Sequence, residues 1–301
     1  MANVYEIVTE KVLAAMAAGV APWRQVWRSV DGAGPRSMST RREYRGCNVV
    51  LLSIAAVVEG YSSPWWGTYE QVKGLGGQVR RGQKSTLVVF WKRTERRQEN
   101  EDGEEETRRG FLLRYFSVFS EQQCDWPDGS PFATEPDDGA PRVEPIEAAQ
   151  SVWSGYEGAP ELRHSGDRAY YSPKDDVVAM PPRDSFESSE YYYSVLFHEA
   201  THSTGHAKRL GRDGIVELAD GGHGFGSESY AKEELVAELG AAFLCAAAGI
   251  ENAATLEVSA AYLRHWSERL RSDPKLFVRA AAQAQRAADH ILGCKFENGG
   301  D

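Results

Sequence analysis

Apolar positions three and four residues apart predict several helices along this chain. One such stripe covers residues 3–18, and a continuous apolar run at 47–60 predicts a buried helix. A short helix is expected within 66–77, where glycines end it. The helical pattern then dominates the second half, where we expect helices over 143–156, 190–207, 229–249, 256–271 and 273–292.

Two segments between these helical regions are rich in β-branched and aromatic residues and predict strands. They are "STLVVFWKR" at 85–93 and "GFLLRYFSVF" at 110–119. The charged run between them, "TERRQENEDGEEETRRG", is too polar to pack, so we expect a solvated hairpin loop there. Further along, "AYYSPKDDVVAMPP" predicts a short β-hairpin.

A segment dense in proline, glycine and aspartate divides the chain, "PDGSPFATEPDDGAPRVEP". Such a composition is typical of linkers. We therefore place a linker at 131–144, between one domain of residues 1–130 and another of residues 145–301. The predicted class is α+β, with a mixed α/β N-terminal domain followed by a mainly helical domain.

Charge divides the chain in the same way. Residues 1–97 contain 15 Lys+Arg and 7 Asp+Glu, a net charge of +8; the whole chain carries −10, so the remainder carries −18. A basic and an acidic half indicate two domains with different partners. The four cysteines are far apart and no run of about 18 apolar residues occurs, so we expect a cytoplasmic protein without a membrane partner.

The helical half contains a metal-binding motif. The sequence His198-Glu199-Ala200-Thr201-His202 has the form H-E-x-x-H, and a helix places its two histidines on one face. His198 and His202 are therefore candidate ligands of one metal ion. Glu199 is the candidate catalytic residue, a general base that activates water for hydrolysis.

The third ligand distinguishes between kinds of site. A metzincin needs a histidine at position 208, but this residue is Lys208, and His206 comes two positions too early. All four methionines precede the motif, so the metzincin Met-turn is absent from its usual place. His206 and His223 remain minor candidates for the third ligand. The competing interpretation places them near the mouth of the cleft or at the end of the helix.

A glutamate from a second helix is the better candidate. The segment "YAKEELVAELGAAFLCAAAG" carries Glu233, Glu234 and Glu238 beside an apolar face. Carboxylates that border a buried face need partners, because burying an uncompensated charge is costly. We expect Glu234 to be the third ligand and Glu238 to accept a hydrogen bond from a ligand histidine. Zn²⁺ is the expected metal, with Mn²⁺ and Co²⁺ as alternatives.

Tryptophans and basic residues are interleaved near the start of the chain, and five of the eight tryptophans occur within the first 91 residues. Proteins that bind single strands need a positive groove for phosphates and flat aromatic faces for bases. The competing interpretation places most of these tryptophans in the core, as we expect for Trp23 and Trp91. The candidate DNA-contacting residues are Arg41, Arg42, Arg45, Trp65, Trp66, Arg80, Arg81 and Lys84.

Both halves resemble one family, the ArdC-type antirestriction proteins of plasmids and phages. The N-terminal resemblance lies in "APWRQVW", "YRGCNVVLL" and "GYSSPWWGTYEQVKGLGGQVRRGQKSTLVVFWK". The C-terminal resemblance lies in "AYYSPKDDVVAMPPRDSFESSEYYYSVLFHEATHSTGHAKRL" and "YAKEELVAELGAAFLCAAAGI". The resemblance implies an N-terminal domain that binds single-stranded DNA and a C-terminal zincin-like metallopeptidase domain. It also implies protection of incoming DNA from host restriction during transfer.

Two other hypotheses stay open on the sequence. In one, the protein is a DNA-binding shield whose metal site is structural or vestigial. In the other, it is a plain zinc metallopeptidase, and the N-terminal domain only recruits a protein or peptide substrate. A test of single-stranded DNA binding separates the second of these from the other hypotheses.

Overall fold

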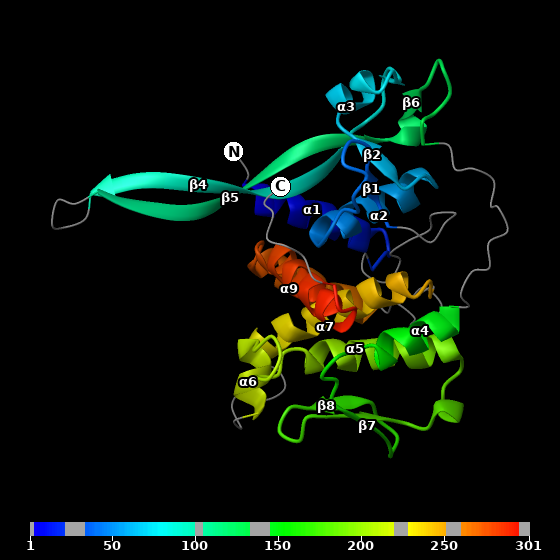
Figure 1. Cartoon of the computed structure of the whole chain (residues 1–301), viewed down its shortest axis with the longest axis vertical. Coiled ribbons are helices and arrows are strands. Elements are labelled where there is room, and N and C mark those ends of the chain that lie inside the picture. Colours follow the sequence, from blue (N-terminus) through cyan, green and yellow to red (C-terminus); the bar gives the residue numbers. More distant parts are fainter. Residues whose placement is uncertain are drawn as a thin grey trace.

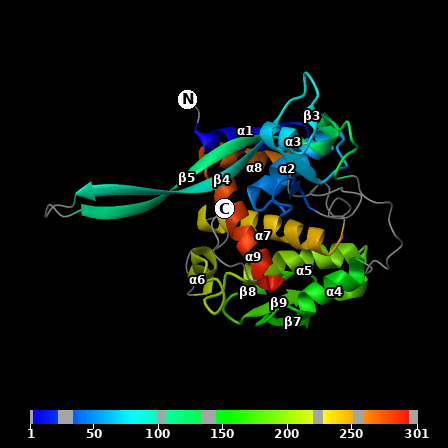
Figure 2. The same cartoon turned by 45° about the horizontal axis from the view of Figure 1, so that its top comes forward.

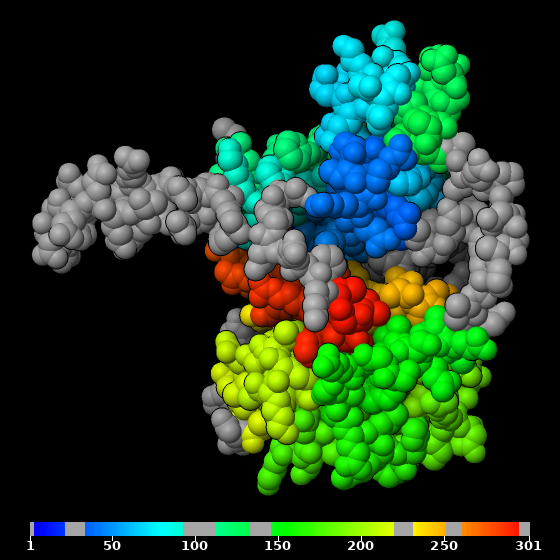
Figure 3. Space-filling model, in the orientation of Figure 1, coloured from blue at the N-terminus to red at the C-terminus, as the bar shows by residue number. Residues whose placement is uncertain are grey.

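The fold is described from a computed structural model over residues 3–21, 34–99, 105–132, 145–219, 228–250 and 260–294. Strands and helices segregate as an α+β protein does. The N-terminal half forms an upper layer and the C-terminal half a lower layer, with helix α9 (Leu276–Ile291) between them (Figure 1). The space-filling view shows the two halves in contact along this boundary (Figure 3).

The N-terminal half combines helices with a four-stranded sheet in the order β1-β2-β5-β4. Strands β3 and β6 pair as a separate ribbon. The helices predicted at 3–18, 47–60 and 66–77 are all present. The elements are α1 (Val4–Ala17), β1 (Arg36–Ser37), α2 (Cys47–Glu59), β2 (Trp65–Gly67), α3 (Tyr69–Gly74), β3 (Gln78–Val79), β4 (Thr86–Glu99), β5 (Glu105–Ser120) and β6 (Cys124–Asp125).

Strands β4 and β5 form a long hairpin that projects away from the body (Figures 1 and 2). Their antiparallel register runs from Thr86 opposite Val118 to Glu99 opposite Glu105. The predicted solvated loop is therefore too long, because pairing continues through much of the charged run. The hydrogen bonds between antiparallel strands join backbone groups, so a charged sequence can pair in this way.

The C-terminal half is mainly helical, as predicted. Strand β9 (Val177–Met180) pairs antiparallel with β8 (Tyr170–Ser172), which confirms the short hairpin, and parallel with β7 (Glu161–His164), which the sequence pattern did not reveal. The short helix α6 was also missed. The helices are α4 (Pro145–Ser154), α5 (Ser189–Ser203), α6 (Asp213–Ala219), α7 (Glu228–Ala247), α8 (Ala260–Ser272) and α9.

One hydrophobic core crosses the boundary between the halves. It includes Val8 and Val12 of α1, Leu87 of β4 and Phe277 of α9. Polar contacts accompany it: the Thr9 hydroxyl donates to the carbonyl of Pro274 at 2.9 Å. The division at 1–130 and 145–301 stays a prediction, and most of the proposed linker lies outside the described residues. Within the described ranges, no helix is long and apolar enough to span a membrane.

Helices α5 and α7 pack closely because a glycine faces a threonine between them. A Cβ atom placed on Gly240 would lie 2.4 Å from the Thr201 Cγ2 atom and 2.6 Å from its Oγ1 atom. Thr201 cannot turn away freely, since its hydroxyl donates to the Phe197 carbonyl at 2.7 Å. This close approach brings the acidic residues of α7 next to the histidines of α5.

A Gly240→Ala substitution is expected to lower the free energy of unfolding by about 1–2 kcal/mol. The added methyl group must push the helices apart, which outweighs the helix propensity of alanine. Urea denaturation measures the change. Gly74→Ala is the control, because a Cβ there meets no atom within 4 Å. Equal stability of the two variants would contradict this packing argument.

Candidate metal centre

Helix α5 is buried over most of its length, and its packing fixes where the histidines lie. The Ser188 side chain caps the helix by accepting a hydrogen bond from the Tyr191 amide at 3.1 Å. Large side chains at helical spacing, including Tyr193, Leu196 and Phe197, are almost fully buried in the core. With these side chains fixed in the core, His198 and His202 face α7, where both lie beside Glu234.

The structure brings the three predicted ligands together. Their donor atoms lie within 4.8 Å of one another. The Nε2 atoms of His198 and His202 are 3.2 Å apart, and carboxylate oxygens of Glu234 lie 3.6 Å and 3.5 Å from them. Ligand atoms about 2.0–2.1 Å from one tetrahedral zinc ion lie about 3.3 Å apart, so this donor set fits one ion.

The pKa shifts of the three donor residues show that positive charge is favoured between them. Burial lowers the pKa of His198, but the carboxylates of Glu234, Glu199 and Glu238 together outweigh this, so the pKa lies above its usual value. Burial opposes protonation of His202 as well, yet Glu233 and Glu234 raise its pKa to about 10. Burial raises the pKa of Glu234, and the two histidines more than reverse this, so its pKa falls far below the usual range.

Glu233 lies beside the Nδ1 atom of His202, across the imidazole ring from the donor atom Nε2. The sequence analysis did not predict this contact. The buried Nδ1 atom of His202 makes no hydrogen bond of ordinary geometry with any described residue, and the nearest Glu233 oxygen lies 3.4 Å away. At this distance the contact is an ion-pair separation, and a small shift of either side chain makes it a hydrogen bond. Glu233 can thus orient the imidazole so that Nε2 faces His198 and Glu234.

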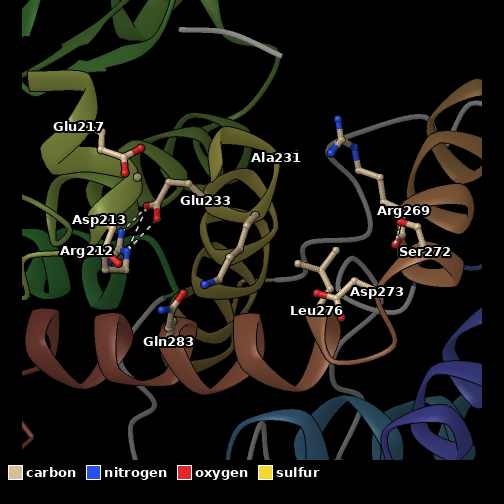
Figure 4. A pocket seen from close by; sticks show the side chains of 12 residues that line it. Arg212, Asp213, Glu217, Ala231, Glu233, Arg269, Ser272, Asp273, Leu276 and Gln283 are labelled. Carbon is tan, nitrogen blue, oxygen red and sulfur yellow. Dashed lines mark hydrogen bonds and ion pairs between the residues drawn. The ribbon is translucent and has the colours of Figure 1, made fainter. Parts of the chain in front are cut away.

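Arg212 compensates the buried charge of Glu233. Its Nε atom donates to a Glu233 oxygen at 2.9 Å, and its other nitrogens donate to the Thr204 hydroxyl at 2.6 Å and the Thr201 carbonyl at 2.7 Å. Figure 4 shows this pair on the wall of a cavity of about 350 Å³. Two features of the sequence could have indicated this pair. Glu233 directly precedes the predicted ligand Glu234, and Arg212 follows the histidine motif by ten residues.

The other candidate residues of this half fall into place around the donors. Glu199 is buried and contributes to the raised pKa of both histidines. Glu238 also raises the pKa of His198, and its predicted hydrogen bond to a ligand histidine stays a prediction. His206 does not join the donor group, and its Nδ1 atom accepts from the Lys208 amide at 3.2 Å. His223 lies outside the described residues.

The tryptophans of the N-terminal half differ from expectation. Trp66 is only 1% exposed and packs edge-on against Tyr61, so its ring offers no face to a base; we remove it from the candidate DNA contacts. Trp91 was expected in the core but is 42% exposed beside Tyr5. Trp91 lies on the same face of β4 as the buried Leu87 and Val89, but it comes after them along the strand, where the core ends. Trp23 lies outside the described residues.

Several of the candidate basic residues have structural partners. Arg80 donates to the Cys124 carbonyl at 3.0 Å and to the Gln122 carbonyl, which ties β3 to the segment after β5. Arg45 forms an ion pair with Asp289 of α9. The remaining candidates lie at or near the surface: the guanidinium of Arg41 covers the half-buried Trp65 ring at 5.1 Å, and Arg42, Arg81 and Lys84 are exposed.

Comparisons with known proteins assign both halves. Residues 155–283 match a family described as zincin-like metallopeptidase, and residues 2–119 match the N-terminal domain of anti-restriction factor ArdC. The fold and the donor group place the C-terminal half in the class of zincin-like metallopeptidase domains, which implies a divalent metal.

Solved structures give the family of the whole chain. The metal-free crystal structure of the antirestriction protein ArdC from plasmid R388 superposes with a TM-score of 0.73 at 37% identity, covering 96% of this chain and 97% of that one. The Mn(II)-bound structure of the same protein superposes with a TM-score of 0.71 at 35% identity, covering 98% of this chain and 100% of that one. The chain belongs to the ArdC antirestriction family.

Curated relatives agree with this assignment. An uncharacterized protein, y4eC of Sinorhizobium fredii (strain NBRC 101917 / NGR234), is 37% identical over 95% of this chain and 91% of its own length. The DNA primase TraC of Escherichia coli is 33% identical over 96% of this chain, which spans only 20% of that protein. A second TraC is 35% identical, and the chain spans 27% of it.

Proposed function

We propose that this antirestriction protein binds single-stranded DNA through its N-terminal half and carries a zinc-dependent hydrolytic centre in its C-terminal half. The observation that supports this most is the convergence of His198, His202 and Glu234 beside the buried Glu199, in a chain whose other half matches the ArdC N-terminal domain. A peptide or protein is the proposed substrate of the hydrolytic centre.

The residues of the centre divide the work of hydrolysis. His198, His202 and Glu234 would hold the ion, which supplies Lewis acidity and lowers the pKa of water when bound. Glu199 takes the proton from the attacking water and returns it to the leaving group, which requires a carboxylate next to the ligand histidines. Glu233 and Arg212 keep the His202 ring in place.

Hydrolysis also needs a group that stabilises the negatively charged oxygen of the intermediate. Arg209 is not available for this, since it is bonded to Asp176, Tyr171 and the Ser203 carbonyl.

A Glu199→Gln variant is expected to retain its metal and to lose the part of the DNA protection that depends on hydrolysis. The amide keeps the shape of the side chain but cannot accept the proton, which typically removes a factor of about 10²–10⁴. The assay compares metal content and the protection of unmodified plasmid DNA transferred into a restricting host. Full protection by a metal-loaded Glu199→Gln protein would favour the DNA-binding shield over the hydrolase.

The full chain is expected to bind a fluorescent oligo(dT) strand with a steep dependence on salt. An Arg81→Ala, Lys84→Ala variant should bind more weakly and lower the slope of log K against log salt by about 0.7 for each phosphate that is no longer neutralised. Both side chains are exposed, unlike Arg80, whose removal would disturb the fold. The control is Arg168→Ala, Lys174→Ala, which removes two exposed charges from the C-terminal half. Equal slopes for the two variants would contradict this placement of phosphate contacts.

A further inference from the structure

The β4–β5 hairpin exposes apolar side chains where it leaves the body. Leu112 is 47% exposed and Phe116 is 51% exposed, although other residues of the same strand are buried. Residues paired across antiparallel strands point to the same side, as do residues two apart. The register pairs Phe90 with Arg114 and Lys92 with Leu112. These residues and Phe116 therefore share one face, which we call the hairpin face (Phe90, Lys92, Leu112, Arg114 and Phe116).

Two aromatic rings on this face are stacked. The centroids of Phe90 and Phe116 lie 4.5 Å apart with 5° between their planes. A parallel stack of this kind presents a flat π surface at its open side, and Phe116 is the more exposed of the pair. Unstacked bases bind to such surfaces whatever their identity, because every base has a π face.

Positive charge accompanies the rings. Lys92 and Arg114 are exposed, and neither forms an ion pair with any residue that the structure describes. The strand segments 86–94 and 110–120 contain no aspartate or glutamate. In a chain with a net charge of −10, this face therefore carries two positive side chains beside aromatic surface.

We propose that the hairpin face is a base-stacking platform for single-stranded DNA, in which Phe116 carries a base and Lys92 and Arg114 contact the adjacent phosphates. The proposal rests on the single-strand binding proposed above and gives it a location. None of the aromatic residues of this face was among the sequence candidates, which concentrated on arginines and tryptophans nearer the N-terminus.

A second copy of the chain fits this face less well than a nucleic acid does. In a two-fold symmetric contact the same patch meets itself, so the positive charges of Lys92 and Arg114 would be brought close to those of the other copy. Like charges brought together in an interface oppose association, and lysine is depleted from interface cores. A single strand instead offers negative phosphates and flat bases at once.

The test uses the full chain and fluorescence anisotropy of labelled oligo(dT). Phe116→Leu keeps an apolar side chain but removes the π face, and should weaken binding at least about fivefold, the effect of losing one stacked base. Phe116→Trp should restore binding to within about threefold of wild type. Arg114→Gln should lower the salt slope by about 0.7. The control is Tyr170→Leu, which removes a 54% exposed ring from the C-terminal half.

The outcomes separate this proposal from the one on which it rests. If the wild-type protein does not bind the strand at low salt, the proposed single-strand binding fails and this inference with it. If the wild type binds and Phe116→Leu binds equally well, the hairpin face is not the platform, although single-strand binding stands. A change of sedimentation behaviour in Phe116→Leu, with DNA affinity unchanged, would identify the face as a contact between copies and also overturn the proposal. Circular dichroism verifies that each variant is folded.

Discussion

A Glu234→Gln variant is expected to bind Zn²⁺ or Mn²⁺ at least about 100-fold more weakly than the wild type. The glutamate oxygens lie 3.5 Å and 3.6 Å from the two histidine nitrogens, so the carboxylate is the anionic member of the donor group. Loss of a residue that only supports a ligand typically costs about 10–100-fold, and loss of a direct donor should exceed this. Isothermal titration calorimetry of the full chain, stripped of metal beforehand, gives the affinity.

Two controls make this prediction specific. Glu190→Gln changes the charge of α5 by the same amount two turns before His198, and should leave metal affinity unchanged. His206→Ala should also have no effect, because His206 lies outside the donor group. A loss of affinity in His206→Ala together with normal affinity in Glu234→Gln would mean that the third ligand has been misassigned.

Arg212→Met is expected to destabilise the protein by about 3–5 kcal/mol. Both Arg212 and Glu233 are buried, and removal of the arginine leaves an uncompensated carboxylate in the interior. The Thr204 hydroxyl and the Thr201 carbonyl lose a donor at the same time. Urea denaturation measures the free energy of unfolding. Metal affinity should fall as well, because Glu233, which orients His202, loses the partner that fixes its position.

The double variant Arg212→Met, Glu233→Gln tests the cause. Removing both charges should recover most of the lost stability, since two neutral side chains carry no uncompensated charge. Metal affinity should stay low, because the glutamine no longer supports His202 as a carboxylate does. If the double variant is as unstable as Arg212→Met alone, packing around the arginine matters more than its charge.

The helices and the first part of the metal site could be predicted from the sequence because they depend on local spacing. The i, i+4 histidines of H-E-x-x-H must lie on one face of α5 wherever the helix packs. The assignment of Glu234 needed one further step, since a buried carboxylate must find a partner. That step was ambiguous between neighbouring acids, and Glu233 was overlooked as the residue that faces His202.

The remaining features depend on tertiary packing, which spacing does not encode. Trp66 is buried because α2 and the sheet close over it, whereas Trp91 lies farther out on the hairpin and stays half exposed. The aromatic stack of Phe90 and Phe116 follows from the register of β4 and β5, which the charged run between them concealed. Composition therefore indicated a basic, aromatic half correctly but could not say which rings are available to a ligand.

The metal centre is tested most directly by anomalous scattering from crystals soaked in Mn²⁺. We predict one strong peak between His198 Nε2, His202 Nε2 and the Glu234 carboxylate, at about 2.0–2.3 Å from each donor. Crystals of Glu234→Gln should lack this peak. A peak at His206 or elsewhere, with none between these three side chains, would contradict the proposed metal centre.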